Sequence, residues 1–260
     1  MDLELTGRRA LVTGGSRGIG LAVARALAAE GADVALVARH EDALSRAAQE
    51  VANVGGRRVI WAVADTGDDA AVRAMVASVT SQLGGIDILV NAAATPATRA
   101  PFTDDDLERE INVKVRGYLR CARAVAPQMA ERGWGRIINI SGLAARQTSN
   151  VVGTIRNVAV VGMTKNLADE LGSQGINVTV VHPGFTRTES TPDALVAMAQ
   201  ARGTNAEQLE HRLEEAVSIG RLVTADEVAA VVAFLASPKS IALNGDSVVA
   251  SGGARGSIHY

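Results

Sequence analysis

Seven short runs rich in Val, Ile and Leu recur along the chain, and longer Ala-rich stretches separate them. We expect these runs to be β-strands, at 9–13, 33–38, 58–64, 86–92, 136–141, 176–182 and 246–251. The stretches between them predict helices, at 19–30, 41–53, 68–83, 103–131, 155–171 and 224–236. Strands that alternate with helices predict a parallel sheet with helices on both faces. Right-handed crossovers then give a doubly wound α/β fold with a mainly parallel, seven-stranded sheet.

One domain over residues 1–260 is the simplest organisation, because no linker, repeat or low-complexity segment interrupts the pattern. Hydrophobic residues make up 47% of the chain and aromatic residues only 3%, so aliphatic side chains must fill the core. The least regular stretch is 185–222, which contains TRTESTPDA and EQLEHRLEEA. Two interpretations of this stretch stay open: a mobile flap over a cleft, or a plain insertion at the surface.

Charge and cysteine content exclude several classes of protein. The formal net charge of -2 argues against nucleic acid as an electrostatic partner. The single cysteine, Cys121, excludes an internal disulfide and suits a reducing compartment. The start, MDLELTGRR, lacks the basic-then-apolar order of a signal peptide, and no apolar run approaches the roughly 18 residues of a membrane span. We therefore expect a cytoplasmic protein that binds a small molecule, without a metal-ligand cluster and without nucleic acid or a membrane as partner.

The first predicted strand runs directly into TGGSRGIG, at 13–20, which opens the first predicted helix. Gly14 permits a tight turn, and Gly18 and Gly20 let the backbone and the helix approach a pyrophosphate closely. The amino terminus of the helix then faces the negative charge. Glycines also occur in purely structural turns, but their position between the first strand and the first helix favours nucleotide binding.

The spacing of these glycines, with the preceding Thr13, resembles that of the short-chain dehydrogenase/reductase family. Further matches follow in order over essentially the whole chain. LVNAAA, at 89–94, is similar to the family's Asn-Asn-Ala-Gly signature, and HPGFTRT, at 182–188, is similar to its Pro-Gly turn beside the nicotinamide. The stretches 220–237 and 245–253 resemble its last helix and strand.

This resemblance implies a Rossmann-type fold, oxidoreductase activity on a small-molecule substrate and a nicotinamide dinucleotide cofactor. It also implies a homo-oligomer, a dimer or a tetramer, built through the helices expected at 103–131 and 155–171. Burial against the sheet would explain the Ala- and Val-rich faces of these two helices equally well. Asp65, after the third predicted strand, matches the family's contact to adenine. The residues expected to contact the cofactor are Gly14, Ser16, Arg17, Gly18, Ile19, Gly20, Arg39, Asp65, Thr66, Asn91, Ala92, Ala93, Asn157, Pro183, Gly184, Thr186 and Thr188.

The second predicted strand ends in ALVARH, at 35–40, and bears on the choice of dinucleotide. Ala38 and Arg39 stand where an acidic residue would select NAD(H). The guanidinium group of Arg39 would instead receive a 2′-phosphate, and Arg17 in the glycine-rich loop would add a second positive charge. Both residues could also be ordinary solvated arginines. We favour NADP(H) over NAD(H) as the cofactor.

Members of this family use a tyrosine as general acid/base, a lysine four residues later that lowers its pKa, and a serine that orients the substrate carbonyl. With the chain aligned on VVGMTKNLADELG, at 160–172, the tyrosine position holds Gly153 and the lysine position holds Asn157. A shifted alignment cannot restore the pair, because the only two tyrosines are Tyr118 and Tyr260. Neither is followed by a lysine four residues later, so the chain lacks the motif Tyr-x-x-x-Lys.

The serine position is altered too. NISG, at 139–142, resembles the family's Asn-Ile-Ser-Ser, which places Gly142 at the catalytic position and Ser141 one residue early. A shift by one residue turns a strand side chain to the opposite face, so Ser141 is expected to be structural unless a bulge re-aims it. Asn112 matches the family's asparagine in the central helix, and Asn157 can still bond ribose hydroxyls. The candidate catalytic residues are therefore Asn112, Ser141 and Asn157.

Few residues could replace the lost acid. Gly153 vacates the volume of a phenol, which leaves room for water or for a bulkier ligand. Arg146 and Gln147 precede the helix and could touch a ligand. His182 is the only histidine near the cleft by sequence, but packing or backbone bonding is the favoured role for it beside Pro183.

Three functions stay open. The first, which we favour, is an NADP(H)-dependent oxidoreductase with a non-standard active site. The second is a catalytically inactive NADP(H)-binding protein, either a redox sensor or a partner in a hetero-oligomer with an active relative. The third is a non-redox lyase or hydrolase that uses the vacated pocket, although the chain offers no Ser-His-Asp order and no paired carboxylates near the cleft.

Overall fold

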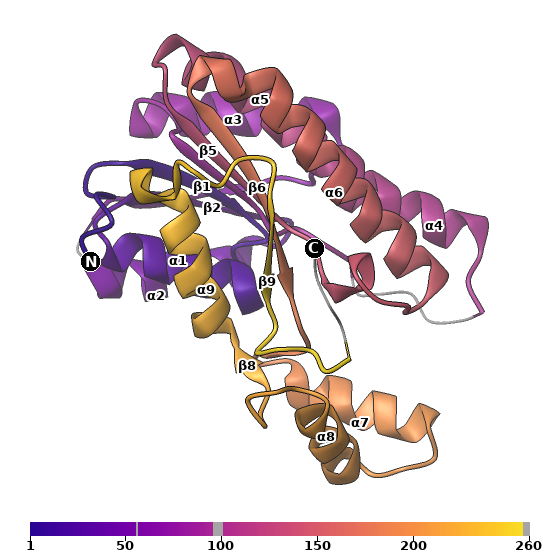
Figure 1. The fold of residues 1–260 in the computed structure, drawn as a ribbon. Coiled ribbons are helices and arrows are strands. Elements are labelled where there is room, and N and C mark those ends of the chain that lie inside the picture. The colour runs from indigo at the N-terminus through magenta and orange to yellow at the C-terminus, as the bar shows by residue number, and fades with distance from the viewer. Residues whose placement is uncertain (56, 96–100, 257–260) are drawn as a thin grey trace.

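The computed structural model describes residues 1–55, 57–95 and 101–256, and its centre is a seven-stranded parallel sheet (Figure 1). The order β3-β2-β1-β4-β5-β6-β9 confirms the predicted doubly wound fold. The chain runs outward from β1 to β3 and then crosses back to β4, so ligands are expected at the carboxyl ends of β1 and β4. The strands are β1 (Arg9–Thr13), β2 (Asp33–Ala38), β3 (Val59–Val63), β4 (Ile88–Asn91), β5 (Gly135–Ile140), β6 (Ile176–Pro183) and β9 (Ser247–Ala250).

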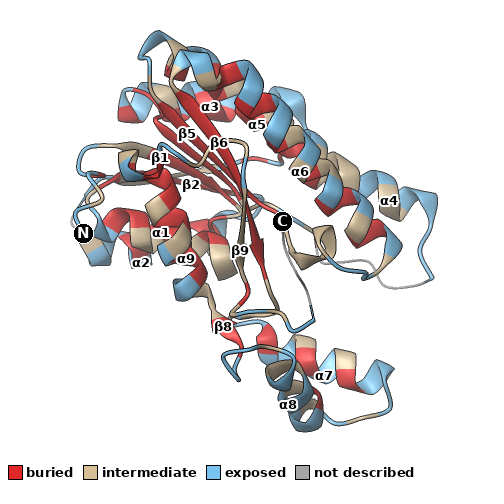
Figure 2. Cartoon of the chain, in the orientation of Figure 1, coloured by how far each residue is buried: buried red, intermediate tan, exposed pale blue. Residues whose placement is uncertain are grey.

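Helices cover both faces of this sheet, as predicted (Figure 1). Along β1 the side chains alternate between two cores: Ala10 and Val12 belong to one, and Leu11 belongs to the other. Strands that are buried on both faces explain the continuous apolar runs of the sequence (Figure 2). The first core is covered by α1 (Gly18–Ala29), α2 (Glu41–Gly55) and α9 (Ala225–Ala236), and the second by α3 (Asp69–Leu83), α5 (Gly117–Glu131) and α6 (Val151–Leu171).

The helical stretch predicted at 103–131 changes type twice. It begins as α4 (Asp104–Glu110), where Thr103 forms a capping box with Asp106. A π-helical turn, η1 (Ile111–Arg116), follows, and α5 then continues the stretch. The predicted helical stretch is therefore confirmed in its extent, and a π-helical turn interrupts its α-helical geometry. Single π-helical turns inside α-helices are frequent at functional sites, because the widened turn re-aims its side chains.

Helix α6 begins at Val151, four residues before the predicted start. The side chain of Asn150 caps it, since Oδ1 of Asn150 accepts the backbone N–H of Gly153 at 2.6 Å. Gly153 and Asn157 therefore lie one turn apart inside the helix, and both are buried. The predicted positions share one face of the helix, as their spacing required.

The segment 185–222 is more regular than its sequence suggested. It contains β7 (Thr186–Arg187), α7 (Thr191–Ala201) and α8 (Ala206–Glu215), and β7 pairs with β8 (Val223–Thr224). A small separate core holds the two helices together, formed by Leu195, Ala199 and Leu209. In Figure 1 this segment lies apart from the main sheet and its covering helices. Its role as a flap remains a prediction.

Candidate functional site

The glycine-rich loop lies between β1 and α1 and packs closely against the residues that follow β4. Gly14 has a φ of 68°, and a Cβ atom on it would lie 2.8 Å from the backbone of Ala92 and Ala93. A Cβ atom on Gly20 would lie 2.2 Å from the backbone oxygen of Gly14. Glycine is therefore required at both positions by space as well as by conformation. The loop leaves the amino end of α1 next to the carboxyl ends of β1 and β4, as a dinucleotide site requires.

Thr13 connects this loop to the end of β4 by hydrogen bonds. Its Oγ1 accepts the backbone N–H groups of Ala92 at 3.2 Å and of Ala93 at 3.3 Å. The next residue inward, Asn91, is fully buried and donates from Nδ2 to Oδ1 of Asn139 on β5 at 3.0 Å. The structure thus brings the predicted cofactor residues of β1 and β4 together around one buried polar network.

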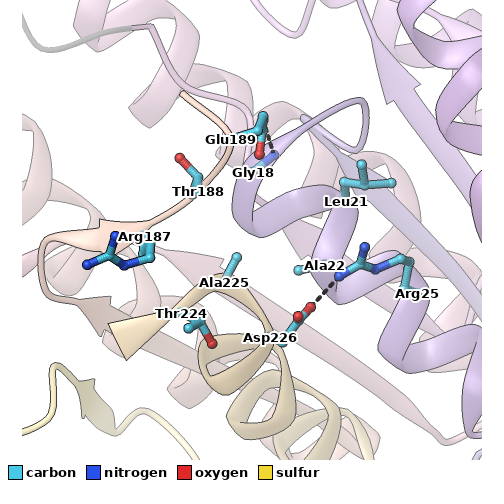
Figure 3. Close-up of a pocket in the computed structure, with 10 residues that line it drawn as sticks. All are labelled: Gly18, Leu21, Ala22, Arg25, Arg187, Thr188, Glu189, Thr224, Ala225 and Asp226. Atoms are coloured by element: carbon cyan, nitrogen blue, oxygen red, sulfur yellow. Dashed lines mark hydrogen bonds and ion pairs between the residues drawn. The ribbon is translucent and has the colours of Figure 1, made fainter. Parts of the chain in front are cut away.

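A pocket of about 250 Å³ adjoins the amino end of α1 (Figure 3). The backbone N–H of Gly18 donates to Oε1 of Glu189 at 2.9 Å across it. Arg17 is exposed and contributes no side-chain hydrogen bond to the helix cap. Thr188, another predicted cofactor residue, also lines the pocket. The pocket therefore joins the phosphate loop to the start of the segment 185–222.

The remaining predicted residues of the Pro-Gly turn come from the end of β6 and from β7. Pro183 is the last residue of β6 and is buried. Thr186 donates from its hydroxyl group to the backbone oxygen of Gly184 at 3.0 Å, which rigidifies the turn. This turn carries the chain from the sheet to Thr188 and the pocket of Figure 3.

The loops after β2 and β3 form the other side of the site. Arg39 is exposed just after β2, where Ala38 pairs with Val63 of β3. Asp65 accepts the backbone N–H of Gly67 at 2.8 Å, and Thr66 is buried. Residues Arg39, Asp65 and Thr66 therefore follow adjacent strands, as expected for contacts to the adenosine half of a dinucleotide.

Asn112 belongs to this side of the site. Its Nδ2 donates to the backbone oxygen of Gly67 at 3.1 Å, and its Oδ1 accepts from Arg120 at 2.9 Å. Of the three candidate catalytic residues, the structure brings Ser141 and Asn157 together. The side chain of Asn112 is bonded to the loop after β3 instead.

Ser141 and Asn157 are in direct contact, because the hydroxyl group of Ser141 turns toward α6. Oγ of Ser141 donates to the backbone oxygen of Asn157 at 3.2 Å and lies 3.3 Å from its Oδ1. Gly142 is next in the chain, and a Cβ atom on it would lie 3.4 Å from Nδ2 of Asn157. Ser141 thus holds Asn157 in place, which is a structural contact of the expected kind.

The turn η1 brings a lysine into this same region. Lys114 is 4% exposed, and its Nζ donates to the backbone oxygen of Ser141 at 3.0 Å. Burial is the main cause that lowers the pKa of Lys114 to about 7, the charge of Arg156 lowers it further, and Glu110 opposes the shift. A buried amine that titrates near neutrality is an unusual feature and marks a candidate functional group.

A buried ion pair lies beside Lys114. Arg156, on α6, contacts Oε2 of Glu110 at 2.7 Å and donates to the backbone oxygen of Thr95 at 3.3 Å. The two side chains are 9% and 0% exposed. Arg156 is thus buried on the side of α6 that faces α4, where it pairs with Glu110.

A tyrosine and a histidine near the site both contact backbone oxygens. The hydroxyl group of Tyr118 donates to the backbone oxygen of Ile140 at 3.0 Å, and burial raises its pKa. Nδ1 of His182 lies 3.2 Å from the backbone oxygen of Gly142, so His182 has the backbone contact that the sequence favoured. Arg146 is half-buried and Gln147 is exposed in the loop before α6. Tyr260 lies outside the described residues.

Within the described ranges, no group of three or more His, Cys, Asp or Glu residues could hold a metal ion. No helix there is long and apolar enough to cross a bilayer. The thiol of Cys121 is buried on α5, which raises its pKa to about 12.

Comparisons with known proteins agree with the geometry of the phosphate loop. A family model described as "Enoyl-(Acyl carrier protein) reductase" matches residues 14–255. The short-chain reductase protein NovJ of Streptomyces niveus is 36% identical over 248 residues, which cover 94% of this chain and 92% of NovJ. The chain belongs to the short-chain dehydrogenase/reductase family. This family membership makes it a relative of known oxidoreductases.

Solved structures of this family superpose closely on the chain. L-sorbose reductase from Gluconobacter frateurii, complexed with NADPH and L-sorbose, gives a TM-score of 0.92 at 30% identity and covers 99% of this chain and 100% of its own. An NAD+-bound xylitol dehydrogenase gives 0.91 at 27% identity and covers 96% of this chain and 100% of its own. The two cofactors differ, so the comparison leaves the choice between NADP(H) and NAD(H) open.

Four residues of the site escaped the sequence analysis: Glu110, Lys114, Arg156 and Glu189. The spacing of Glu110 and Lys114 was a usable signal, because residues four apart share one face of a helix. Lysines are almost never fully buried, so the sequence alone favours a surface position for Lys114. Glu189 gave no signal, because its contact to Gly18 joins distant parts of the chain.

Proposed function

We propose that this family member is an NADP(H)-dependent oxidoreductase with a non-standard active site, in which Gly153 and Asn157 replace the family's tyrosine and lysine. The observation that carries the proposal is the phosphate loop. Gly14 and Gly20 stand where any side chain would collide with the backbone, so the loop keeps the close approach that a pyrophosphate needs. The residues of this loop fit a dinucleotide at the amino end of α1.

The preference for NADP(H) rests on two exposed arginines. Arg39 follows β2, where an acidic residue would bond the ribose 2′-hydroxyl of NAD(H). Arg17 lies in the phosphate loop and has no side-chain contact to the helix cap. Guanidinium groups at these two positions would favour a 2′-phosphate, because they can form charge-assisted hydrogen bonds to it.

A nicotinamide cofactor supplies a hydride, and the protein must bind it, orient the substrate and provide a proton. Asn157 carries two amide N–H groups suited to ribose hydroxyls, and Ser141 fixes its orientation. Gly153 supplies no phenol, and the loss of a positioned acid costs about a hundred- to ten-thousand-fold in rate. Quinones and activated alkenes need the weakest proton donors, so we propose them as the substrate class.

The test is direct. Binding of NADPH and NADH is measured by titration calorimetry, and NADPH consumption is then followed with ketones, quinones and enones. We expect NADPH to bind more tightly than NADH, and consumption to be fastest with quinones or enones. Failure to bind at near-millimolar NADPH would contradict the proposal.

A second candidate function is a catalytically inactive NADP(H)-binding subunit in a hetero-oligomer with an active relative. Two observations favour it: the chain has no Tyr-x-x-x-Lys, and a groove of about 730 Å³ lies between α5 and α6. Apolar side chains line part of this groove, among them Leu119, Ala122, Met163, Leu167 and Leu171. The same surface supports the proposal of a homodimer or homotetramer through α5 and α6.

Light scattering tests the assembly. We expect the wild-type chain to have the mass of a dimer or tetramer, and Met163→Glu to reduce it by placing a charge in the groove. Binding of NADPH without consumption across the substrate panel, together with mixed oligomers on co-expression with an active relative, would favour the inactive subunit.

A further inference from the structure

Lys114 lies beside the position where α6 lacks its lysine. Its ammonium group donates to the backbone oxygen of Ser141, and the side chain of Ser141 bonds Asn157. Lys114, Ser141 and Asn157 therefore form one continuous chain of contacts from η1 to α6. Asn157 stands at the position of the family's lysine, so the amine on η1 is linked through Ser141 to the position where α6 has lost a positive charge.

The charged neighbours of Lys114 come from several elements. Glu110 precedes it by one turn, and Arg156 reaches Glu110 from α6 at 2.7 Å. From α5, Tyr118 bonds the backbone oxygen of Ile140, next to the one that Lys114 bonds. From β6, His182 contacts the backbone oxygen of Gly142 on the other side. The carboxylate of Glu110 is paired with Arg156, and the bond to Ser141 uses one of the three N–H groups of the ammonium.

A purely structural role does not account for a lysine here. A neutral amide of similar length could donate to the oxygen of Ser141 without the cost of burying a charge. Buried ionisable groups with strongly shifted pKa values cluster at functional sites, and π-helical turns are frequent at such sites.

We propose that Lys114 supplies, from η1, the positive charge that α6 lacks, and that its ammonium group binds the nicotinamide ribose hydroxyls together with Asn157. The inference rests on the proposed function, because it takes a nicotinamide cofactor to be the ligand. In the family pattern the positive charge comes from the lysine on the helix that corresponds to α6, whereas here it would come from η1. Cofactor binding here would also require the uptake of a proton.

Proton uptake is the expected signature. Above pH 7 part of the Lys114 amine is neutral in the free protein, since its pKa lies at about 7. Hydrogen bonds to the ribose favour the charged form, so cofactor binding raises this pKa and draws a proton from the buffer. The 2′-phosphate of NADPH does not contribute at pH 8, because a phosphate monoester is already ionised there.

The experiment is titration calorimetry of the full-length protein with NADPH at pH 8, in two buffers of different ionisation enthalpy, which reports the protons taken up. Lys114→Gln is compared with wild type, and Lys165→Gln, an exposed lysine on α6, is the matched control. We expect proton uptake in wild type and in the control, none in Lys114→Gln, and a dissociation constant about tenfold higher in that variant.

Equal proton uptake in wild type and Lys114→Gln would overturn the inference. The absence of proton uptake in wild type would overturn it too. This second result needs no variant, so the inference can be refuted even if Lys114→Gln does not fold. Wild-type protein that binds neither NADPH nor NADH would instead refute the proposed function itself.

Discussion

The backbone N–H of Gly18 donates a 2.9 Å hydrogen bond to the carboxylate of Glu189. Gly18 opens α1, and Glu189 lies just before α7 in the segment 185–222 (Figure 3). A side-chain anion thus occupies the end of the helix that is expected to receive the pyrophosphate of a dinucleotide. The carboxylate and the proposed cofactor would compete for the same N–H group, and this competition would couple cofactor binding to the position of this segment.

Glu189→Gln should therefore tighten NADPH binding. The substitution removes a competing negative charge at a helix amino terminus, where an anion is worth about 0.3–1 kcal/mol, so we expect a two- to fivefold lower dissociation constant. Titration calorimetry measures the change. Glu207→Gln, an exposed carboxylate on α8, is the control and should leave the constant unchanged. Weaker binding by Glu189→Gln would show that Glu189 assists the cofactor instead.

Arg39→Ala should weaken the binding of NADPH about tenfold and leave NADH binding unchanged. The reason is that the guanidinium group is proposed to contact only the 2′-phosphate, through charge-assisted hydrogen bonds. Arg46→Ala removes another exposed arginine, on α2, and controls for the loss of surface charge. Equal losses for NADPH and NADH would contradict the proposed preference for NADP(H).

The ion pair of Glu110 and Arg156 should be sensitive to the loss of one partner. Arg156→Met removes the guanidinium group that lies 2.7 Å from a fully buried carboxylate, so urea unfolding should show a loss of about 3–5 kcal/mol. The double variant Glu110→Leu with Arg156→Met removes both members of the ion pair, so neither is left buried without the other, and most of the stability should return. A loss below about 1 kcal/mol in the single variant would mean that Glu110 is neutral or differently paired.

Lys114 should make stability depend on pH above neutrality. Its pKa falls from 10.5 to about 7 on folding, so between these pH values the unfolded chain binds a proton that the folded protein does not. The free energy of unfolding should therefore rise with pH in this window, by about 1 kcal/mol per pH unit from this residue. Urea unfolding of wild type and Lys114→Gln at pH 7, 8 and 9 measures this contribution, as the difference between their free energies of unfolding. A constant difference would contradict the lowered pKa.

The sheet was predictable because its strands are buried on both faces, which leaves continuous aliphatic runs between helical patterns. The residues at which the strands begin and end were harder to predict. Asp87, for example, lies within a predicted strand, but it precedes β4 and forms ion pairs with Arg9 and Arg132. The phosphate loop was predictable too, because glycine is required at several of its positions and the spacing of these glycines is visible in the sequence.

The site beside α6 was only partly predictable. The absence of Tyr-x-x-x-Lys follows from the two tyrosines of the chain. The early start of α6 depends on the cap by Asn150, which lies among other polar residues that could equally have capped it. The π-helical turn carries no distinct pattern of residues. The burial of Lys114 follows from that turn, so it became visible only in the structure.

Hydride transfer from NADPH that carries deuterium at C4 of the nicotinamide is the decisive test of the proposed oxidoreductase activity. The acceptor is an activated alkene, because the new carbon–hydrogen bond then retains the label for mass spectrometry. We expect one deuterium in each reduced product, delivered from one of the two positions at C4. NADPH that binds but is never oxidised with any alkene, quinone or ketone would contradict the proposed oxidoreductase activity.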